Sequence, residues 1–282
     1  EMGEWFKYFV KSPKRRSPAI NRGYWLRMES IRRIVLKIIQ ENPGKSISIV
    51  NLGCGFDPFP FQILSEFRSK RQDSQALHFI DIDYPDLVKN KKDMMIESPE
   101  IMELLGEARE DNKTNKNIVM SFKNYSLIGC NLRELDLFNS LLEQVNIAEV
   151  TIFIAEVSLA YMKPEFSDPV IANASKYANS HFIILEQLLP VGSNYPFAKK
   201  MIYHFDHLRS PLGCITKYPT LKDQRERFAA LFTKVQARDL MYHWLHSIDL
   251  DSKAQISSIE AFDEWEEFII FCQHYCIIYA TN

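Results

Sequence analysis

No stretch of this sequence stays apolar for long. None approaches the roughly 20 consecutive apolar residues that a helix needs to cross a bilayer. The first residues, Glu1-Met2-Gly3-Glu4, also lack the basic and then apolar pattern of a secretory signal. We therefore expect a cytoplasmic protein with no membrane partner.

Glycine, cysteine and net charge are scarce as well. Only 9 of the 282 residues are glycine and 46% are hydrophobic, which favours a helix-rich globule with a full core. The net charge of −2 excludes a globally basic nucleic-acid binder, so an RNA partner would need a local basic patch.

The 5 cysteines are odd in number and lie in apolar sequence, as buried reduced thiols do. Cys272 and Cys276 flank His274, but no second ligand pair completes a zinc site, and we predict no metal.

Several catalytic signatures are missing, and the pattern of a nucleoside site remains. The sequence has no nucleophile elbow of a serine hydrolase, no P-loop and no paired-carboxylate motif. The apolar run Ile47–Leu52 breaks into Gly53-Cys54-Gly55, as a buried strand does when it ends in a tight turn. Asp57 and Pro58 stand where a pyrophosphate-binding loop would carry its next glycine. An acid at this place suits a cationic ligand, such as S-adenosylmethionine.

A second predicted strand supplies carboxylates. Leu77–Ile82 leads to Asp81 and Asp83, which alternate with isoleucines and therefore share one face. Asp83 stands at the end of the strand, because Pro85 follows it closely, and there it could accept hydrogen bonds from a ribose. Asp81 is the second candidate for that contact. A purely structural turn would explain the glycines but not these two carboxylates.

Two further strand ends carry polar side chains. Asn131 follows the predicted strand Tyr125–Ile128, where its amide could pair with adenine while Leu132 packs on the ring. The alternative is that Asn131 is the N-cap of the next helix. Glu156 ends the predicted strand Val150–Ala155, over the point where the strand order reverses. A structural salt bridge is the alternative explanation for this carboxylate.

Strands and amphipathic helices alternate along the chain. This alternation predicts an α/β fold with a mostly parallel seven-stranded sheet, helices on both faces and one antiparallel strand added at the end. The predicted strands are Ile47–Leu52, Leu77–Ile82, Tyr125–Ile128, Val150–Ala155, His181–Glu186, Lys234–Asp239 and His274–Ala280. We expect residues 1–45 to form an N-terminal helical cap and residues 46–282 a Rossmann-like domain, with helical lid insertions near 88–123 and 192–227.

Basic residues gather near the N-terminus. Arg22 and Arg27 flank the aromatic pair Tyr24-Trp25, and a guanidinium is a natural two-pronged clamp for a carboxylate. Ordinary surface arginines would give the same pattern. The preceding cluster Lys14-Arg15-Arg16 is either a solvated turn or a place where phosphates dock. The candidate RNA-binding residues are therefore Lys14, Arg15, Arg16 and Arg22.

Taken in order, these motifs resemble the leucine carboxyl methyltransferase family over nearly the whole chain. The segments that carry the resemblance are Asn21–Tyr24, Val50–Asp57, Ile80–Pro85, Ile154–Glu156 with Tyr161-Met162, and Glu186-Gln187. The resemblance implies the class I S-adenosylmethionine-dependent methyltransferase fold. It also implies that the cofactor is held by Arg27, Gly53, Asp83, Asn131, Leu132 and Glu156. Family members usually carry aspartate in place of Asn131. Gly55 and Asp81 complete our set of candidate cofactor-binding residues.

The similarity is greatest to family members that modify tRNA. It implies methylation of the side-chain carboxylate of a wybutosine precursor in phenylalanine tRNA. A carboxylate, with a pKa near about 4, is already ionised at neutral pH and needs no general base. Arg27 and Tyr161 are the candidate catalytic residues, with the role of positioning this carboxylate. Two alternatives stay open: methylation of the C-terminal leucine of a phosphatase catalytic subunit, and a non-catalytic nucleoside-binding scaffold.

Overall fold

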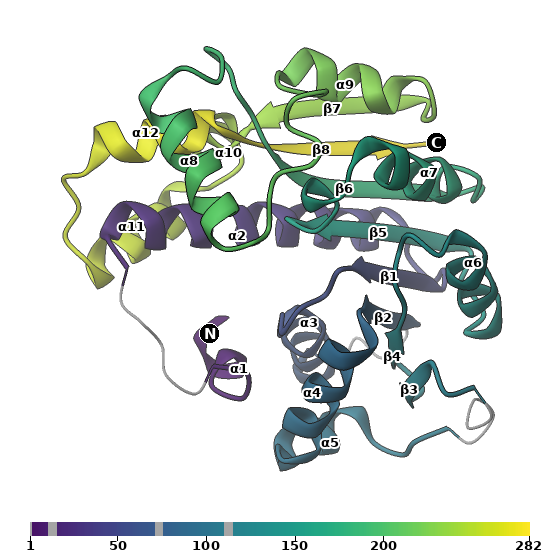
Figure 1. Ribbon diagram of the computed structural model, residues 1–282. Coiled ribbons are helices and arrows are strands. Elements are labelled where there is room, and N and C mark those ends of the chain that lie inside the picture. The colour runs from purple at the N-terminus through teal and green to yellow at the C-terminus, as the bar shows by residue number, and fades with distance from the viewer. Residues whose placement is uncertain (1, 11–15, 71–75, 110–114) are drawn as a thin grey trace.

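The centre of the molecule is one eight-stranded sheet (Figure 1). The structure is a computed structural model that describes residues 2–10, 16–70, 76–109 and 115–282. The strands are β1 (Ile47–Leu52), β2 (Leu77–Asp83), β3 (Ile118–Ser121), β4 (Tyr125–Gly129), β5 (Val150–Glu156), β6 (Ser180–Gln187), β7 (Lys234–Asp239) and β8 (Tyr275–Thr281). Their order across the sheet is β3-β4-β2-β1-β5-β6-β8-β7.

The sheet has one strand more than the sequence predicts. All seven predicted strands are present, each within one residue of its predicted bounds. The eighth is β3, which lies in the segment predicted as a helical insertion. It pairs antiparallel with β4, and its register shifts between Ile118 and Met120. The predicted number of strands was wrong because so short and irregular an edge strand produces no alternating pattern.

Most of the sheet is parallel, as predicted. β1 pairs in parallel with β2 and with β5, and the parallel arrangement continues to β4 on one side and to β6 on the other. β8 lies between β6 and β7 and is antiparallel to both. The predicted antiparallel strand at this end of the sheet is therefore confirmed.

Helices cover both faces of the sheet (Figure 1). One face carries α6 (Leu135–Gln144), α7 (Pro164–Ala174) and α9 (Leu221–Ala229). The other carries α2 (Pro18–Glu41), α3 (Phe59–Ser69), α4 (Pro85–Ile96), α5 (Pro99–Leu105), α10 (Leu240–His246) and α12 (Trp265–Gln273). Val50 and Ile80 face the first layer, whereas Ile49 and Phe79 face the second. Because both faces are covered, every residue of β1 is buried.

Four further elements complete the chain. α1 (Met2–Phe6) packs on α3, and the 3₁₀ turn η1 (Leu159–Tyr161) follows β5. α8 (Pro196–His207) buries Ala198 and Met201, whereas α11 (Leu250–Ile259) buries no residue. Across the described ranges, no helix is both long and apolar enough to span a membrane. The division into a cap and a main domain stays a prediction, and α2 shares one core cluster with the sheet.

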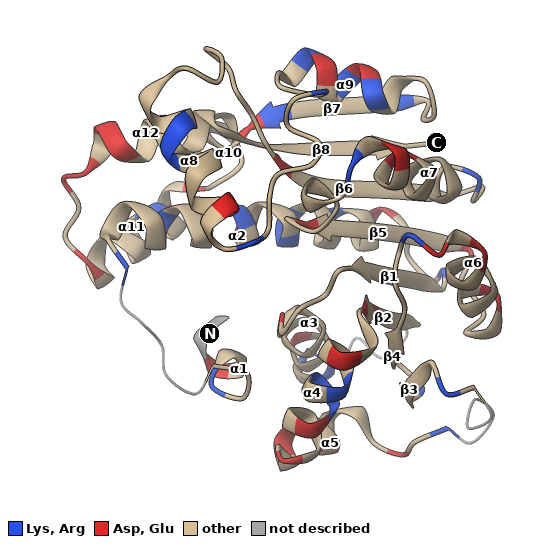
Figure 2. Cartoon of the chain, viewed as in Figure 1, with Lys and Arg blue, Asp and Glu red and all other residues tan. Residues whose placement is uncertain are grey.

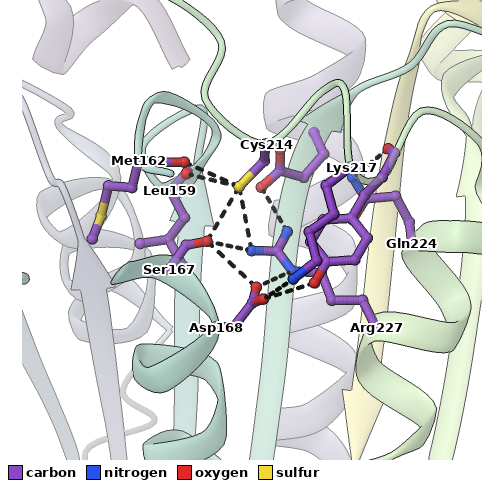
Figure 3. A network of polar contacts seen from close by, with 10 residues as sticks. Leu159, Met162, Ser167, Asp168, Cys214, Lys217, Gln224 and Arg227 are labelled. Carbon is purple, nitrogen blue, oxygen red and sulfur yellow. Dashed lines mark hydrogen bonds and ion pairs between the residues drawn. The ribbon is translucent and has the colours of Figure 1, made fainter. Parts of the chain in front are cut away.

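A buried polar network holds the segment between α8 and α9 (Figure 3). At its centre, Arg227 Nε donates to Asp168 Oδ1 at 2.9 Å, and Arg227 Nη2 donates to Ser167 Oγ at 2.7 Å. Arg227 Nη1 also pairs with Glu186 Oε1 at 3.5 Å. Burial raises the pKa of Glu186 to about 7, although the Arg227 cation opposes the shift. Cys214, which lies between α8 and α9, joins through Ser167 Oγ at 3.2 Å, so the segment is tied to α7, while Arg227 ties α9 to β6.

The strand order reverses at one edge of the sheet, and we call this reversal point the crevice. The carboxyl ends of β1, β2, β4, β5 and β6 meet at this edge because these strands are parallel. β1 lies between β2 and β5, so the chain extends the sheet to one side after β1 and to the other from β5 onward. Ligands of doubly wound sheets bind at such a reversal. Gly53, Asp83 and Glu156 stand at the ends of three of these strands.

Candidate active site at the carboxyl edge of the sheet

The turn after β1 requires glycine. Gly53 has a φ of +76°, and a Cβ there would lie 2.4 Å from the Cβ of Ser158, closer than two carbon atoms can approach. Ser158 belongs to the turn after β5, and its Oγ donates to the Leu52 carbonyl at 2.5 Å. The carboxyl ends of β1 and β5 are therefore locked together at the point where the strand order reverses.

Asp83 lies at the rim of the crevice, as predicted from Pro85. It is the last residue of β2, and its side chain is half-buried. Its Oδ2 accepts the Gly55 N–H at 2.8 Å, and its Oδ1 accepts the Tyr84 N–H at 2.7 Å. Each carboxylate oxygen has a second lone pair, so Asp83 can still accept hydrogen bonds from a ligand.

Asp81 is not at the rim, which corrects its prediction as a cofactor-binding residue. Its side chain is fully buried, with Lys91 Nζ at 2.7 Å from Oδ2 and the Tyr125 hydroxyl donating to the same oxygen at 2.8 Å. Lys91 also donates to the Asp57 carbonyl at 3.0 Å. Asp81 therefore acts through Lys91, which fixes the loop after Gly55. The alternating pattern places Asp81 and Asp83 on one face of the strand but gives no information about how deeply each side chain is buried.

Asn131 and Leu132 follow β4 in a turn. Asn131 Oδ1 accepts the Arg133 N–H at 3.1 Å, and the Asn131 carbonyl accepts the Glu134 N–H at 2.8 Å. The N-cap of α6 is Glu134, so the alternative that Asn131 caps this helix is wrong. Leu132 is 9% exposed. The pair therefore stands beside the end of β2, where an adenine ring could lie.

Glu156 and Arg27 form an ion pair at the end of β5. Arg27 Nε lies 2.7 Å from Glu156 Oε1, and both side chains are partly exposed. The Arg27 guanidinium also lies over the Tyr24 ring, with its carbon 4.7 Å from the ring centre. Val157, the next residue, has a φ of +52°, an unusual conformation for a β-branched residue. The salt bridge considered as the alternative for Glu156 thus exists, and its partner, Arg27, is itself a predicted site residue.

Tyr161 lies in the 3₁₀ turn after β5 and faces α8. Its ring packs against Phe205 of α8 with 5.9 Å between ring centres. Burial raises the pKa of the Tyr161 phenol, and the nearby Arg27 charge offsets only part of this effect. The hydroxyl therefore stays protonated at neutral pH and can donate a hydrogen bond, but it cannot act as a base.

Asp57 is a site residue that the candidate set omitted. It lines, together with Glu156, a small cavity of about 20 Å³ beneath α2. Burial and the Glu156 carboxylate raise the pKa of Asp57 to about 7, although Lys91 opposes the shift. The sequence feature that could have identified Asp57 as a site residue is its position directly after the glycine turn. A larger groove of about 760 Å³ between α1, α2, α3 and α11 is lined by none of the predicted site residues.

Of the predicted RNA-binding residues, the structure describes Arg16 and Arg22, and only Arg16 is exposed. Arg22 is 4% exposed, and its guanidinium carbon lies 3.8 Å from the centre of the Phe262 ring. It cannot reach RNA from there, so its prediction as an RNA-binding residue was wrong. Arg16 is exposed just before α2, whereas Lys14 and Arg15 lie outside the described residues.

Cys272, His274 and Cys276 do not share a strand face. Cys272 belongs to α12 and Cys276 to β8, while His274 lies between the two elements and donates through Nδ1 to the Ile270 carbonyl at 2.7 Å. In the part of the chain that the structure describes, no group of three or more histidines, cysteines and acids could hold a metal ion.

Comparison with known proteins gives relatives over the full chain. The sequence is 52% identical over 290 residues to tRNA wybutosine-synthesizing protein 4 of Candida albicans, covering 100% of this chain and 41% of that protein. It is 43% identical over 287 residues to the protein of the same name from Saccharomyces cerevisiae, covering 99% of this chain and 41% of that protein. The chain thus spans about two fifths of the length of these curated relatives.

The chain was also compared with solved structures and with protein families. An O-methyltransferase family protein from Burkholderia thailandensis aligns with a TM-score of 0.48 and 10% identity, over 89% of this chain and 56% of that chain. Residues 3–175 match the family described as leucine carboxyl methyltransferase. Because this match covers more than half of the sequence, the chain belongs to the leucine carboxyl methyltransferase family.

Proposed function

We propose that this chain transfers a methyl group from S-adenosylmethionine to the side-chain carboxylate of a wybutosine precursor in phenylalanine tRNA. Membership of the family supports carboxyl methyl transfer, and the names of the relatives support the tRNA substrate. The observation that carries the proposal is the ion pair between Arg27 and Glu156. It uses Nε of Arg27, so the two Nη groups remain for a substrate or cofactor carboxylate.

The residues at the carboxyl edge fit this cofactor. A Cβ on Gly55 would meet no atom within 4 Å, so open space lies beside the turn. Asp83 accepts the Gly55 N–H beside this space, and Asp57, two residues after Gly55, lines a small cavity together with Glu156, so three carboxylates stand near this turn against the one guanidinium of Arg27. An excess of negative charge favours a ligand that carries an ammonium and a sulfonium group. When bound, the cofactor supplies an electrophilic methyl group.

The roles of the residues follow from their positions. Asp83 would accept hydrogen bonds from the ribose hydroxyls, and Asn131 with Leu132 would contact adenine. Arg27 and the Tyr161 hydroxyl would orient the substrate carboxylate for attack in line with the bond that breaks. The carboxylate is ionised before it binds, so no residue has to remove a proton. Alignment and the exclusion of water are then the sources of catalysis, and alignment alone can contribute about 7–11 kcal/mol.

Methyl transfer to two substrates tests the proposal. The chain is given labelled S-adenosylmethionine together with either precursor-bearing phenylalanine tRNA or a phosphatase catalytic subunit with a C-terminal leucine. We expect label in the tRNA as a base-labile methyl ester. Equal or faster labelling of the protein would overturn the assigned substrate. Cofactor binding without transfer to either would support the scaffold alternative instead.

The charge of Asp57 makes a pH dependence of cofactor binding testable. Because the pKa of Asp57 is raised to about 7, its carboxylate is largely protonated at pH 6 and ionised at pH 8. A cationic ligand binds the ionised form better, so the affinity for S-adenosylmethionine should rise with pH and level off above about pH 7. The limiting slope is about tenfold per pH unit, since one unit corresponds to about 1.4 kcal/mol.

Calorimetry between pH 5.5 and 8.5 measures this dependence. Asp57→Asn cannot titrate, and we expect it to bind more weakly at pH 8 with a nearly flat profile. The groups that face Asp57 are Glu156, Lys91 and Asp81, and all three are retained in this variant. If Asp57→Asn kept the wild-type slope, the titrating group would have to be another residue or the ligand.

A further inference from the structure

α8 connects the site to the protein surface. Phe205 packs against Tyr161, and Ala198 and Met201 are buried, so one side of this helix is fixed beside the crevice. The opposite side consists of exposed residues at helical spacing, namely Lys199, Lys200, Tyr203, His204, Asp206 and His207. We call this set the outward face of α8.

The outward face of α8 is basic in a chain whose net charge is −2. Among the described residues, no carboxylate lies within ion-pair distance of Lys199, Lys200 or the following Arg209. By contrast, Lys70 and Lys217 are each paired with an acid. Figure 2 shows the cations as a blue band on α8. Asp206 is the single acid in the helix.

An aromatic ring stands among these cations. Tyr203 is 70% exposed, and its ring is stacked with that of His207 at 6.0 Å between centres. Burying so large an exposed ring contributes free energy only when a partner covers it. A ring flanked by unpaired cations is the arrangement that binds single-stranded nucleic acid, because bases stack on the ring while phosphates attract the cations.

We propose that the outward face of α8 binds the anticodon arm of the tRNA, with Lys199 and Lys200 on backbone phosphates and Tyr203 stacked on an unpaired base. This inference rests on the proposed function, since it identifies where the same substrate is held outside the crevice. It replaces Arg22 as a source of RNA contacts. Because Phe205 on the other side of α8 packs on Tyr161, the docked RNA would lie about one helix diameter, roughly 10–12 Å, from the residues that orient its carboxylate.

Charge reversal at the two lysines tests this surface. For Lys199→Glu/Lys200→Glu we expect the Kd for phenylalanine tRNA to rise at least about tenfold near 100 mM salt, because two phosphate contacts are lost. The slope of log affinity against log salt concentration should fall by roughly 1.4–1.8, the contribution of two contacts. Affinity for S-adenosylmethionine, measured by calorimetry, should not change. Tyr203→Ala should weaken tRNA binding without altering the salt slope.

A matched control removes the effect of net charge. Lys176 and Lys234 are also exposed but lie at the opposite, amino edge of the sheet, before β6 and at the start of β7. Lys176→Glu/Lys234→Glu changes the net charge by the same amount and should leave tRNA affinity close to wild type. Equal losses in both double variants would overturn the proposal, since the effect would then be non-specific.

Binding and turnover separate this inference from the function on which it rests. If the wild-type chain methylates tRNA and Lys199→Glu/Lys200→Glu keeps its affinity and salt slope, the proposed function stands and the docking surface is wrong. If the wild type methylates only the phosphatase subunit, the tRNA substrate is wrong. Failure of the wild type to bind tRNA in a filter-binding assay would overturn the docking surface whatever the result of the transfer assay.

Discussion

Arg27→Lys is expected to lower the rate of methyl transfer by at least about a hundredfold, the cost of a small misplacement of reacting atoms. Lysine can keep the ion pair with Glu156, so the fold and the melting temperature should stay close to wild type. A single ammonium cannot hold a carboxylate through two parallel hydrogen bonds as a guanidinium does. The rate should therefore fall through lost orientation and not through unfolding.

Single-turnover transfer from labelled cofactor measures this loss, and thermal melting confirms the fold. Arg32→Lys is the matched control, because Arg32 lies on the same helix and pairs with Glu66 and Glu29 outside the crevice. We expect that control to retain nearly full activity. If Arg27→Lys retained more than half of the wild-type rate, Arg27 would be a structural arginine and the clamp would be wrong.

Lys91→Met is expected to lower the free energy of unfolding by about 3–5 kcal/mol, the usual cost of removing one partner from a buried pair. Lys91 and Asp81 are both 0% exposed, so the variant would leave the Asp81 carboxylate without its cation. Burial alone would lower the pKa of Lys91, but the Asp81 charge outweighs burial and holds this pKa above its ordinary value. Lys91 therefore stays charged at neutral pH, and the loss should persist between pH 6 and pH 9.

Urea unfolding at neutral pH tests the effect of Lys91→Met. The double variant Lys91→Met/Asp81→Asn removes both charges and should recover part of the lost stability. Lys89→Met, on the exposed side of the same helix, should change stability by less than about 0.5 kcal/mol. A double variant as unstable as the single one would mean that lost packing, and not an unpaired charge, is responsible.

Lys91→Met should also weaken cofactor binding in whatever fraction stays folded. Lys91 donates to the Asp57 carbonyl, and Asp57 lies in the loop after the glycine turn. Without this donor the loop loses one of the contacts that fix it against β2. Calorimetry on the folded double variant separates this local effect from the loss of stability.

The strands that form the crevice could be predicted because they are buried on both faces. Such strands give continuous β-branched runs, and their ends are marked by glycine, proline or a carboxylate. This is why Gly53, Asp83 and Glu156 were placed correctly at strand ends. β3 could not be predicted, since a short edge strand with a register shift carries neither signal.

Two properties could not be predicted from the sequence: how deeply a side chain is buried, and which residue far along the chain it contacts. Asp81 and Asp83 look alike in the chain, and only the position of Lys91 on α4 distinguishes a buried carboxylate from one at the rim. The partner of Arg22 is Phe262, which lies 240 residues later and has no local signature near Arg22. Patterns of spacing predict which face a residue is on, whereas its burial depends on helices that pack from elsewhere.

The position of β8 has a consequence for how the chain assembles during synthesis. Among the described strands, β7 pairs with β8 alone, and β8 follows β7 in the chain, so residues 275–281 are synthesised after β7 and α9. Until they arrive, β7 and α9 have no strand to dock on, and the edge of β6 remains an unpaired template for other chains. Glu186, at that edge, also lacks its ion-pair partner, Arg227, until α9 has docked. The nascent chain therefore exposes this edge to aggregation until residues 275–281 have been synthesised and have paired with β6.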